Sequence, residues 1–92
     1  MSARWDDVGY VISSAYRLAV IRELSDGAAT PTELASAIET STTHVSRALR
    51  QLRDRGLVAL AVPGDRAKNR RCELTERGQS AWETIRANDL TG

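Results

Sequence analysis

A Thr-Pro-Thr-Glu sequence at residues 30–33 defines the start of a helix and constrains the fold of the segment after it. Thr30 can accept a hydrogen bond from the backbone of Glu33, whose side chain can return one to Thr30, and this makes a capping box. Pro31 suits the first helical position because no partner is needed there for its missing N–H. The apolar residues of this predicted helix share one side: Leu34, Ala35 and Ile38.

A second helix is predicted at about residues 42–55, after a turn at Glu39-Thr40-Ser41 in which Ser41 is the cap. At 100° per residue its two faces separate cleanly. The inner face is apolar: Val45, Ala48, Leu49 and Leu52. The outer face is polar: Thr43, Arg47, Arg50, Gln51 and Asp54, with His44 at its edge. This arrangement predicts a helix-turn-helix, whose second helix enters the major groove of DNA.

The charges are unevenly distributed along the chain, although its formal net charge is only +1. Residues 42–71 contain eight basic and two acidic side chains, a net charge of +6, and the remainder carries −5. A basic stripe on one contiguous segment is typical of phosphate binding, and an acidic remainder helps to orient the docking. The alternative is an arginine-rich surface that is simply solvated.

A basic β-hairpin is predicted after Gly56, over about residues 59–74. Residues 57–62 form an apolar strand, Pro63-Gly64-Asp65 is turn chemistry, and residues 70–74 form the returning strand. Four cations lie at or near the tip: Arg66, Lys68, Arg70 and Arg71. Beside a groove-reading helix, such a hairpin reaches the flanking backbone or the minor groove.

These elements predict one α+β, mainly α domain over residues 1–92. It is a winged helix-turn-helix with a three-helix core, a two-stranded β-hairpin wing and a C-terminal helix. Residues 6–25 are helical in pattern, and Gly9 and the Ser13-Ser14 pair are expected to break the run near its middle, with Ser13 or Ser14 capping a second segment. The C-terminal helix is predicted over about residues 75–88.

Five short segments occur in a linked order over about residues 5–88. They are Ser14-x-x-Arg17, Thr32-Glu33-Leu34-Ala35, His44-Val45-Ser46-Arg47-x-Leu49-x-x-Leu52, Gly56-Leu57-Val58 and Leu74-Thr75-x-x-Gly78. On these segments the chain resembles the small winged-helix regulators of the MarR and ArsR groups, particularly the short single-domain versions found in archaea. The resemblance implies a winged-helix fold, operator binding as a dimer, and transcriptional control.

The predicted function is therefore sequence-specific binding of double-stranded DNA by a transcriptional regulator. Base reading is assigned to the N-terminal end of the second helix: Thr43, His44 and Arg47. Backbone contacts are assigned to both helices and the wing: Thr32, Ser46, Arg50, Arg53, Arg66, Lys68, Arg70 and Arg71. Arg17, in the first long helix, is a further candidate for a phosphate contact.

The two ends of the chain are predicted to build a homodimer interface. A chain this short has a small core, so association of two copies helps its stability. The candidate interface residues are Trp5, Val8, Ile12, Trp82 and Ile85. The alternative is that Trp5 and Trp82 only cover their own core.

No catalytic site, metal site, cofactor or small-molecule ligand is predicted. One Cys and one His cannot close a four-ligand metal site, and phosphate-loop and dinucleotide motifs do not occur. Cys72 is interpreted as a small wing residue, with a redox sensor beside Arg70 or Arg71 as the alternative. The sequence contains neither a long apolar run nor a secretory signal, so a cytoplasmic protein without membrane contact is expected.

A second class of function fits the same fold, namely a winged-helix protein–protein interaction module in a larger assembly. The basic stripe favours DNA, because a partner-binding surface more often exposes apolar side chains and aromatic anchors. Single-stranded nucleic acid is a weaker third option, because the basic region has no aromatic residue on which bases could stack.

Overall fold

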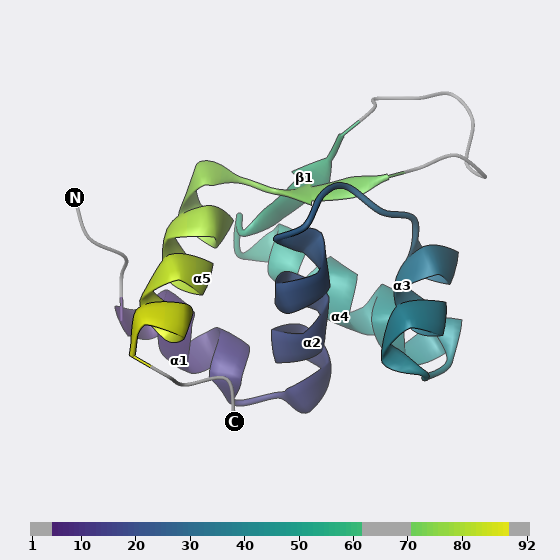
Figure 1. Cartoon of the computed structure of the whole chain (residues 1–92), viewed down its shortest axis with the longest axis horizontal. Helices are drawn as coiled ribbons and strands as arrows, with labels where there is room; N and C mark the ends of the chain where they lie inside the picture. Colours follow the sequence, from purple (N-terminus) through teal and green to yellow (C-terminus); the bar gives the residue numbers. More distant parts are fainter. Residues whose placement is uncertain (1–4, 62–70, 89–92) are drawn as a thin grey trace.

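The computed structural model describes residues 5–61 and 71–88, which form five helices and one two-stranded antiparallel sheet. In chain order the elements are α1 (Trp5–Ile12), α2 (Ala15–Leu24), α3 (Pro31–Ile38), α4 (Thr42–Asp54), β1 (Val58–Leu60), β2 (Cys72–Leu74) and α5 (Glu76–Ala87). The predicted winged helix-turn-helix is confirmed (Figure 1). Within the described ranges, every helix is too short or too polar to span a membrane.

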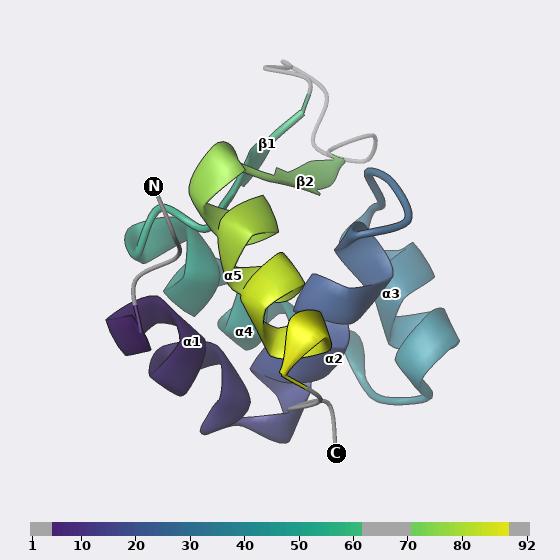
Figure 2. The same cartoon turned by 60° about the vertical axis from the view of Figure 1, so that its left-hand side comes forward.

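Helix α2 lies in the middle of the helical layer and contacts α1, α3, α4 and α5 (Figure 1). Helices α1 and α5 pack together on one side of it, and α3 lies on the other. A 60° turn brings α5 to the front with α4 behind it (Figure 2). The helix predicted to read DNA therefore lies on a different side of the molecule from α5.

The predicted helix caps are confirmed. Thr30 Oγ1 accepts from Glu33 N at 3.1 Å, and Glu33 Oε1 accepts from Thr30 N at 2.9 Å, which completes the capping box. Ser41 Oγ accepts from His44 N at 3.3 Å at the start of α4. Of the two proposed breaks in the N-terminal segment, the one at Ser14 is observed, because its side chain caps α2. Local hydrogen-bond chemistry thus fixes where α2, α3 and α4 begin.

Within the described residues the two strands of the sheet are shorter than predicted, and a segment outside the sheet forms a bridge to β2 that was not predicted. Strand β1 pairs with β2 so that Val58 lies opposite Leu74 and Leu60 opposite Cys72. Ala29, between α2 and α3, exchanges two backbone hydrogen bonds with Cys72, at 2.8 and 3.0 Å. This bridge ties the loop before the helix-turn-helix to the base of the wing. The hairpin tip predicted to carry Arg66, Lys68 and Arg70 lies outside the described residues.

The core is built from all five helices and includes part of the predicted dimer interface. Val8 and Ile85 are 1% and 0% exposed, and Trp82 is 9% exposed, so all three pack inside this chain. Val8 and Ile85 therefore offer almost no side-chain surface to a second copy, and Trp82 offers little, so the exposed candidates for the predicted interface are on α1. Trp5 and Ile12, on α1, are 63% and 39% exposed.

Helix α5 begins in close contact with the segment that comes after α4. Thr75 Oγ1 donates to Gly56 O at 2.7 Å and accepts from Gly78 N at 3.1 Å. Gly78 lies against the Leu57 backbone so closely that a Cβ atom there would overlap Leu57 O. These contacts explain the Leu74-Thr75-x-x-Gly78 segment: threonine caps α5, and glycine lets it approach the start of β1.

Candidate nucleic-acid interface

The outer face of α4 is a continuous polar surface. Its exposed residues recur at helical spacing: Thr43, Ser46, Arg47, Arg50, Arg53 and Asp54. The opposite side is buried, as predicted, through Val45, Ala48, Leu49 and Leu52. None of Arg47, Arg50 and Arg53 has an ion-pair partner among the residues that the structure describes. These three arginines form an exposed stripe along α4, and their guanidinium groups are therefore available to a polyanion.

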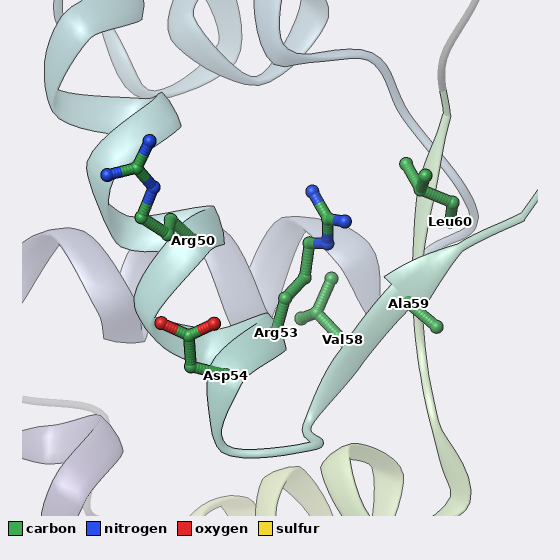
Figure 3. Close-up of a pocket in the computed structure, with 6 residues that line it drawn as sticks. All are labelled: Arg50, Arg53, Asp54, Val58, Ala59 and Leu60. Carbon is green, nitrogen blue, oxygen red and sulfur yellow. The ribbon is translucent and has the colours of Figure 1, made fainter.

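A hollow of about 500 Å³ lies between α4 and β1 on the wing side of this stripe. Both Arg50 and Arg53 line it, and Figure 3 shows the Arg53 side chain between α4 and the strand that carries Leu60, with the Arg50 guanidinium over α4 and farther from that strand. An adjoining hollow of about 240 Å³ is lined by Ser46 together with the same two arginines and Pro31 of α3. Arg50 and Arg53 thus lie where a backbone running between α4 and the wing would pass.

The other side of the stripe faces the start of α2. A hollow of about 280 Å³ there is lined by residues of both helices: Ser14, Tyr16, Arg17, His44, Arg47, Ala48 and Gln51. The His44 ring is stacked on the exposed ring of Tyr16, with 4.6 Å between centroids and 18° between planes. His44 Nδ1 lies 3.2 Å from both Thr40 Oγ1 and Ser41 Oγ. Tyr16 was not predicted as a site residue, because helical periodicity gives no signal for a contact between two helices that are far apart in the sequence.

Arg17, the further candidate for a phosphate contact, has a structural role in this chain. Its Nε donates to Tyr10 O at 2.8 Å, its NH1 group to Gln51 Oε1 at 2.9 Å, and its NH2 group to Ser13 Oγ at 2.6 Å. The guanidinium also lies 4.0 Å from the centre of the Tyr10 ring. Arg17 therefore joins α1, α2 and α4, and it holds Gln51 toward α2 and away from the outer face to which it was assigned.

A buried carboxylate joins α1 to the end of α4 and to α5. Asp7 is 1% exposed and accepts two hydrogen bonds from Arg77, at 2.6 and 2.9 Å, and one from Arg55 at 3.3 Å. The hydrogen bond from Arg77 lowers the pKa of Asp7 below its ordinary 3.8, against the opposing effect of burial, and Arg55 lowers it further. Arg55 thus belongs to this cluster and not to the stripe of exposed arginines on α4.

We expect Asp7→Asn to destabilise the fold by about 2 kcal/mol at neutral pH, because it removes the charge that both guanidiniums face. The value lies below that of a fully buried pair, since the Arg77 and Arg55 side chains are 42% and 35% exposed. Because the pKa of Asp7 is lower in the folded chain than in the unfolded chain, its negative charge stabilises the fold at pH values above the ordinary pKa. This stability is lost as the pH falls through the pKa of the folded chain. The free energy of unfolding of the wild type should therefore decrease as the pH is lowered past about 3.8, and that of Asp7→Asn should depend less on pH in this range. Urea unfolding at several pH values measures both effects.

Glu33→Gln is the matched control for Asp7. The backbone N–H of Thr30 lowers the pKa of Glu33, and Arg71 contributes, but both ends of the Glu33–Arg71 pair are about half exposed. Solvent screens such a pair, so the change should cost less stability than Asp7→Asn. Equal losses in the two variants would show that the Asp7 cluster has no special role in joining the helices.

The remaining predicted contacts border the same surface. Thr32 is exposed in the first turn of α3, and Arg71 is exposed beside β2, with its NH1 group 3.1 Å from Glu33 Oε1. An exposed pair of this kind exchanges partners at little cost, so Arg71 can turn to a phosphate. Cys72 is buried in the base of the wing, in line with its interpretation as a small packing residue.

The arrangement of helices and strands defines a winged helix-turn-helix domain. The chain belongs to the family described as the HVO_A0261 N-terminal domain, whose model matches residues 5–89.

Solved structures show the same fold. A MarR family transcription regulator superposes with a TM-score of 0.76 at 24% identity, over 92% of this chain and 60% of that one. A MarR family transcriptional regulator from Silicibacter pomeroyi gives 0.70 at 27% identity, over 84% and 50%. The adhesin competence repressor from Streptococcus pyogenes gives 0.69 at 26% identity, over 85% and 59%. This chain thus spans between half and three fifths of the length of each of these three proteins. A sequence search among curated proteins found no match.

Proposed function

We propose that this domain binds double-stranded DNA in a sequence-specific way and acts as a transcriptional regulator. The observation that carries the proposal is the stripe of exposed arginines on α4, which have no ion-pair partner in the described part of the chain. The likeness to solved transcription regulators supports it, since three of them share the arrangement of helices and wing. An α-helix fits the major groove, and cations beside it neutralise phosphates on either side.

The two halves of α4 have different roles in this proposal. Thr43, His44 and Arg47 lie in its N-terminal half and face base edges. Ser46, Arg50 and Arg53 border the hollows on the wing side and contact one phosphate backbone. The other proposed backbone contacts are Thr32 and Arg71, and those on the wing outside the described residues: Arg66, Lys68 and Arg70.

Salt dependence tests the proposal directly. The affinity for duplex DNA should fall linearly with salt concentration on logarithmic axes, with a slope that reports the number of phosphates contacted. Replacing Arg50 or Arg53 with alanine should make the slope shallower by about one per residue and weaken all sequences alike. Fluorescence anisotropy with a duplex enriched from a random pool and with a scrambled duplex measures this. Wild-type protein that shows no preference between the two duplexes would refute sequence-specific binding.

We also propose that two copies associate through the outer face of α1. Trp5, Gly9 and Ile12 are four and three residues apart, share one side of the helix and are all exposed. An exposed tryptophan beside an exposed isoleucine is costly to leave in water, and a two-fold contact would bury both on each copy. A dimer would place two α4 helices on one duplex.

Sedimentation at micromolar concentration is expected to show a dimer that Trp5→Ser with Ile12→Ser converts to a monomer. The paired change removes the apolar contact and leaves the core untouched, because both side chains are on the surface. Tyr16→Ser, which removes another exposed aromatic from a different helix, is the control and should leave the dimer intact. Wild-type protein that sediments as a monomer would remove this part of the proposal.

A further inference from the structure

The stacked pair of Tyr16 and His44 joins the start of α2 to the base-reading end of α4. Tyr16 is 42% exposed although it is a large aromatic residue, and the packing of the core does not account for its position. Its ring covers one face of the His44 imidazole at 4.6 Å between centroids. Tyr16 lies outside the helix-turn-helix formed by α3 and α4, so it is not part of the element that reads DNA.

Three contacts leave the His44 ring little freedom to rotate. The Tyr16 ring restricts one face, and the hydroxyls of Thr40 and Ser41 lie 3.2 Å from Nδ1. Nε2 is the remaining polar atom of the ring, and it has no hydrogen-bond partner among the residues described. The hydroxyls of Thr40 and Ser41 can donate to an unprotonated Nδ1 or accept from a protonated one, so both tautomers of the neutral ring keep these contacts, and Nε2 takes the role opposite to that of Nδ1.

We propose that Tyr16 is a positioning residue for base recognition, which fixes the His44 ring so that Nε2 is presented to one base edge. The inference rests on the proposed DNA binding and names the residue outside α4 that sharpens its specificity. A pre-oriented ring loses less conformational freedom when it binds, so its hydrogen bond discriminates better between bases. Arg47 lines the same hollow and supplies the neighbouring contact.

The proposal predicts that Tyr16 acts only through His44. Tyr16→Ala should lower discrimination at one base pair of the bound site by about threefold to tenfold, the effect of one hydrogen bond. His44→Ala should lower discrimination at the same base pair, and adding Tyr16→Ala to it should have no further effect. Tyr16→Phe, which keeps the ring and removes only the hydroxyl, should retain the wild-type preference.

Binding selection from a random duplex pool, carried out with wild type and these variants, gives the preference at each base pair. Proton NMR of the DNA-free protein adds an independent readout, because the ring current of Tyr16 should move the His44 ring protons upfield in wild type and Tyr16→Phe but not in Tyr16→Ala. An unchanged preference in Tyr16→Ala overturns the proposal, as does a further loss when it is added to His44→Ala. Absence of any preference in wild type would instead overturn the proposed function, and this inference with it.

Discussion

Gly78→Ala is expected to destabilise the folded domain by about 3 kcal/mol, a loss at the upper end of the range for overpacking. A Cβ at this position overlaps Leu57 O and lies 3.0 Å from Leu57 C and 3.2 Å from Leu74 Cδ2. The first two atoms belong to the backbone, which cannot move aside as the end of a flexible side chain can. Helix α5 must therefore shift away from the start of β1 and disturb the Thr75 cap. Thermal or urea unfolding measures the loss.

Gly9→Ala is the matched control, because it makes the same chemical change in another helix. Nothing lies within 4 Å of a Cβ built on Gly9, which is exposed within α1. Because Gly9 lies between Trp5 and Ile12 on the proposed contact face, the two glycine changes are compared in the monomeric protein with Trp5→Ser and Ile12→Ser. There, alanine at Gly9 should stabilise the fold by about 0.5–1 kcal/mol, since glycine loses more backbone freedom in a helix. Similar effects of the two variants would show that helix propensity, and not the contact with Leu57, determines the result at Gly78.

Arg47→Ala is expected to lower the affinity for the preferred duplex about 10-fold to 100-fold and to lower it much less for a scrambled one. A bidentate contact between arginine and guanine contributes about 1–3 kcal/mol of discrimination, which would be lost with the guanidinium. Arg47 is suited to this role because it lies in the middle of the exposed face, in the N-terminal half of α4, and has no ion-pair partner among the described residues. Anisotropy titrations with both duplexes measure the two affinities.

Arg86→Ala provides the control for charge alone. It removes one positive charge from the exposed end of α5, outside the proposed interface, so both duplexes should bind nearly as they do to wild type. An equal loss on both duplexes in Arg47→Ala would reassign this residue to a phosphate contact. No loss on either would remove it from the interface.

The elements that the sequence predicts best are those defined by local chemistry. The caps at Thr30 and Ser41 need only hydrogen bonds within one turn, and both are present. The apolar inner side of α4 follows in the same way from spacing along one helix. Contacts between distant segments leave no such pattern. Nothing near Asp7 indicates that Arg77 would be its partner, seventy residues later in the chain.

The sequence is ambiguous about which apolar side chains are buried within the chain itself. Periodicity shows which side of a helix is apolar, but it does not show whether this chain or a second copy covers that side. Val8 and Ile85 were assigned to a partner and are covered by this chain, whereas Trp5 remains exposed. Arg17 and Arg55 show the same ambiguity for charge: both are cations of the predicted type, and both are turned inward to bind other helices.

The central claim is that DNA binds to the exposed face of α4. NMR mapping of the DNA-binding surface on isotope-labelled protein tests this claim most directly. Titration with the selected duplex should shift the backbone amide signals of Thr43, Arg47 and Arg50 most strongly. The signals of Glu83 and Arg86, on α5, should stay nearly constant. The largest shifts on α1 and α5, with those of α4 unchanged, would contradict the account.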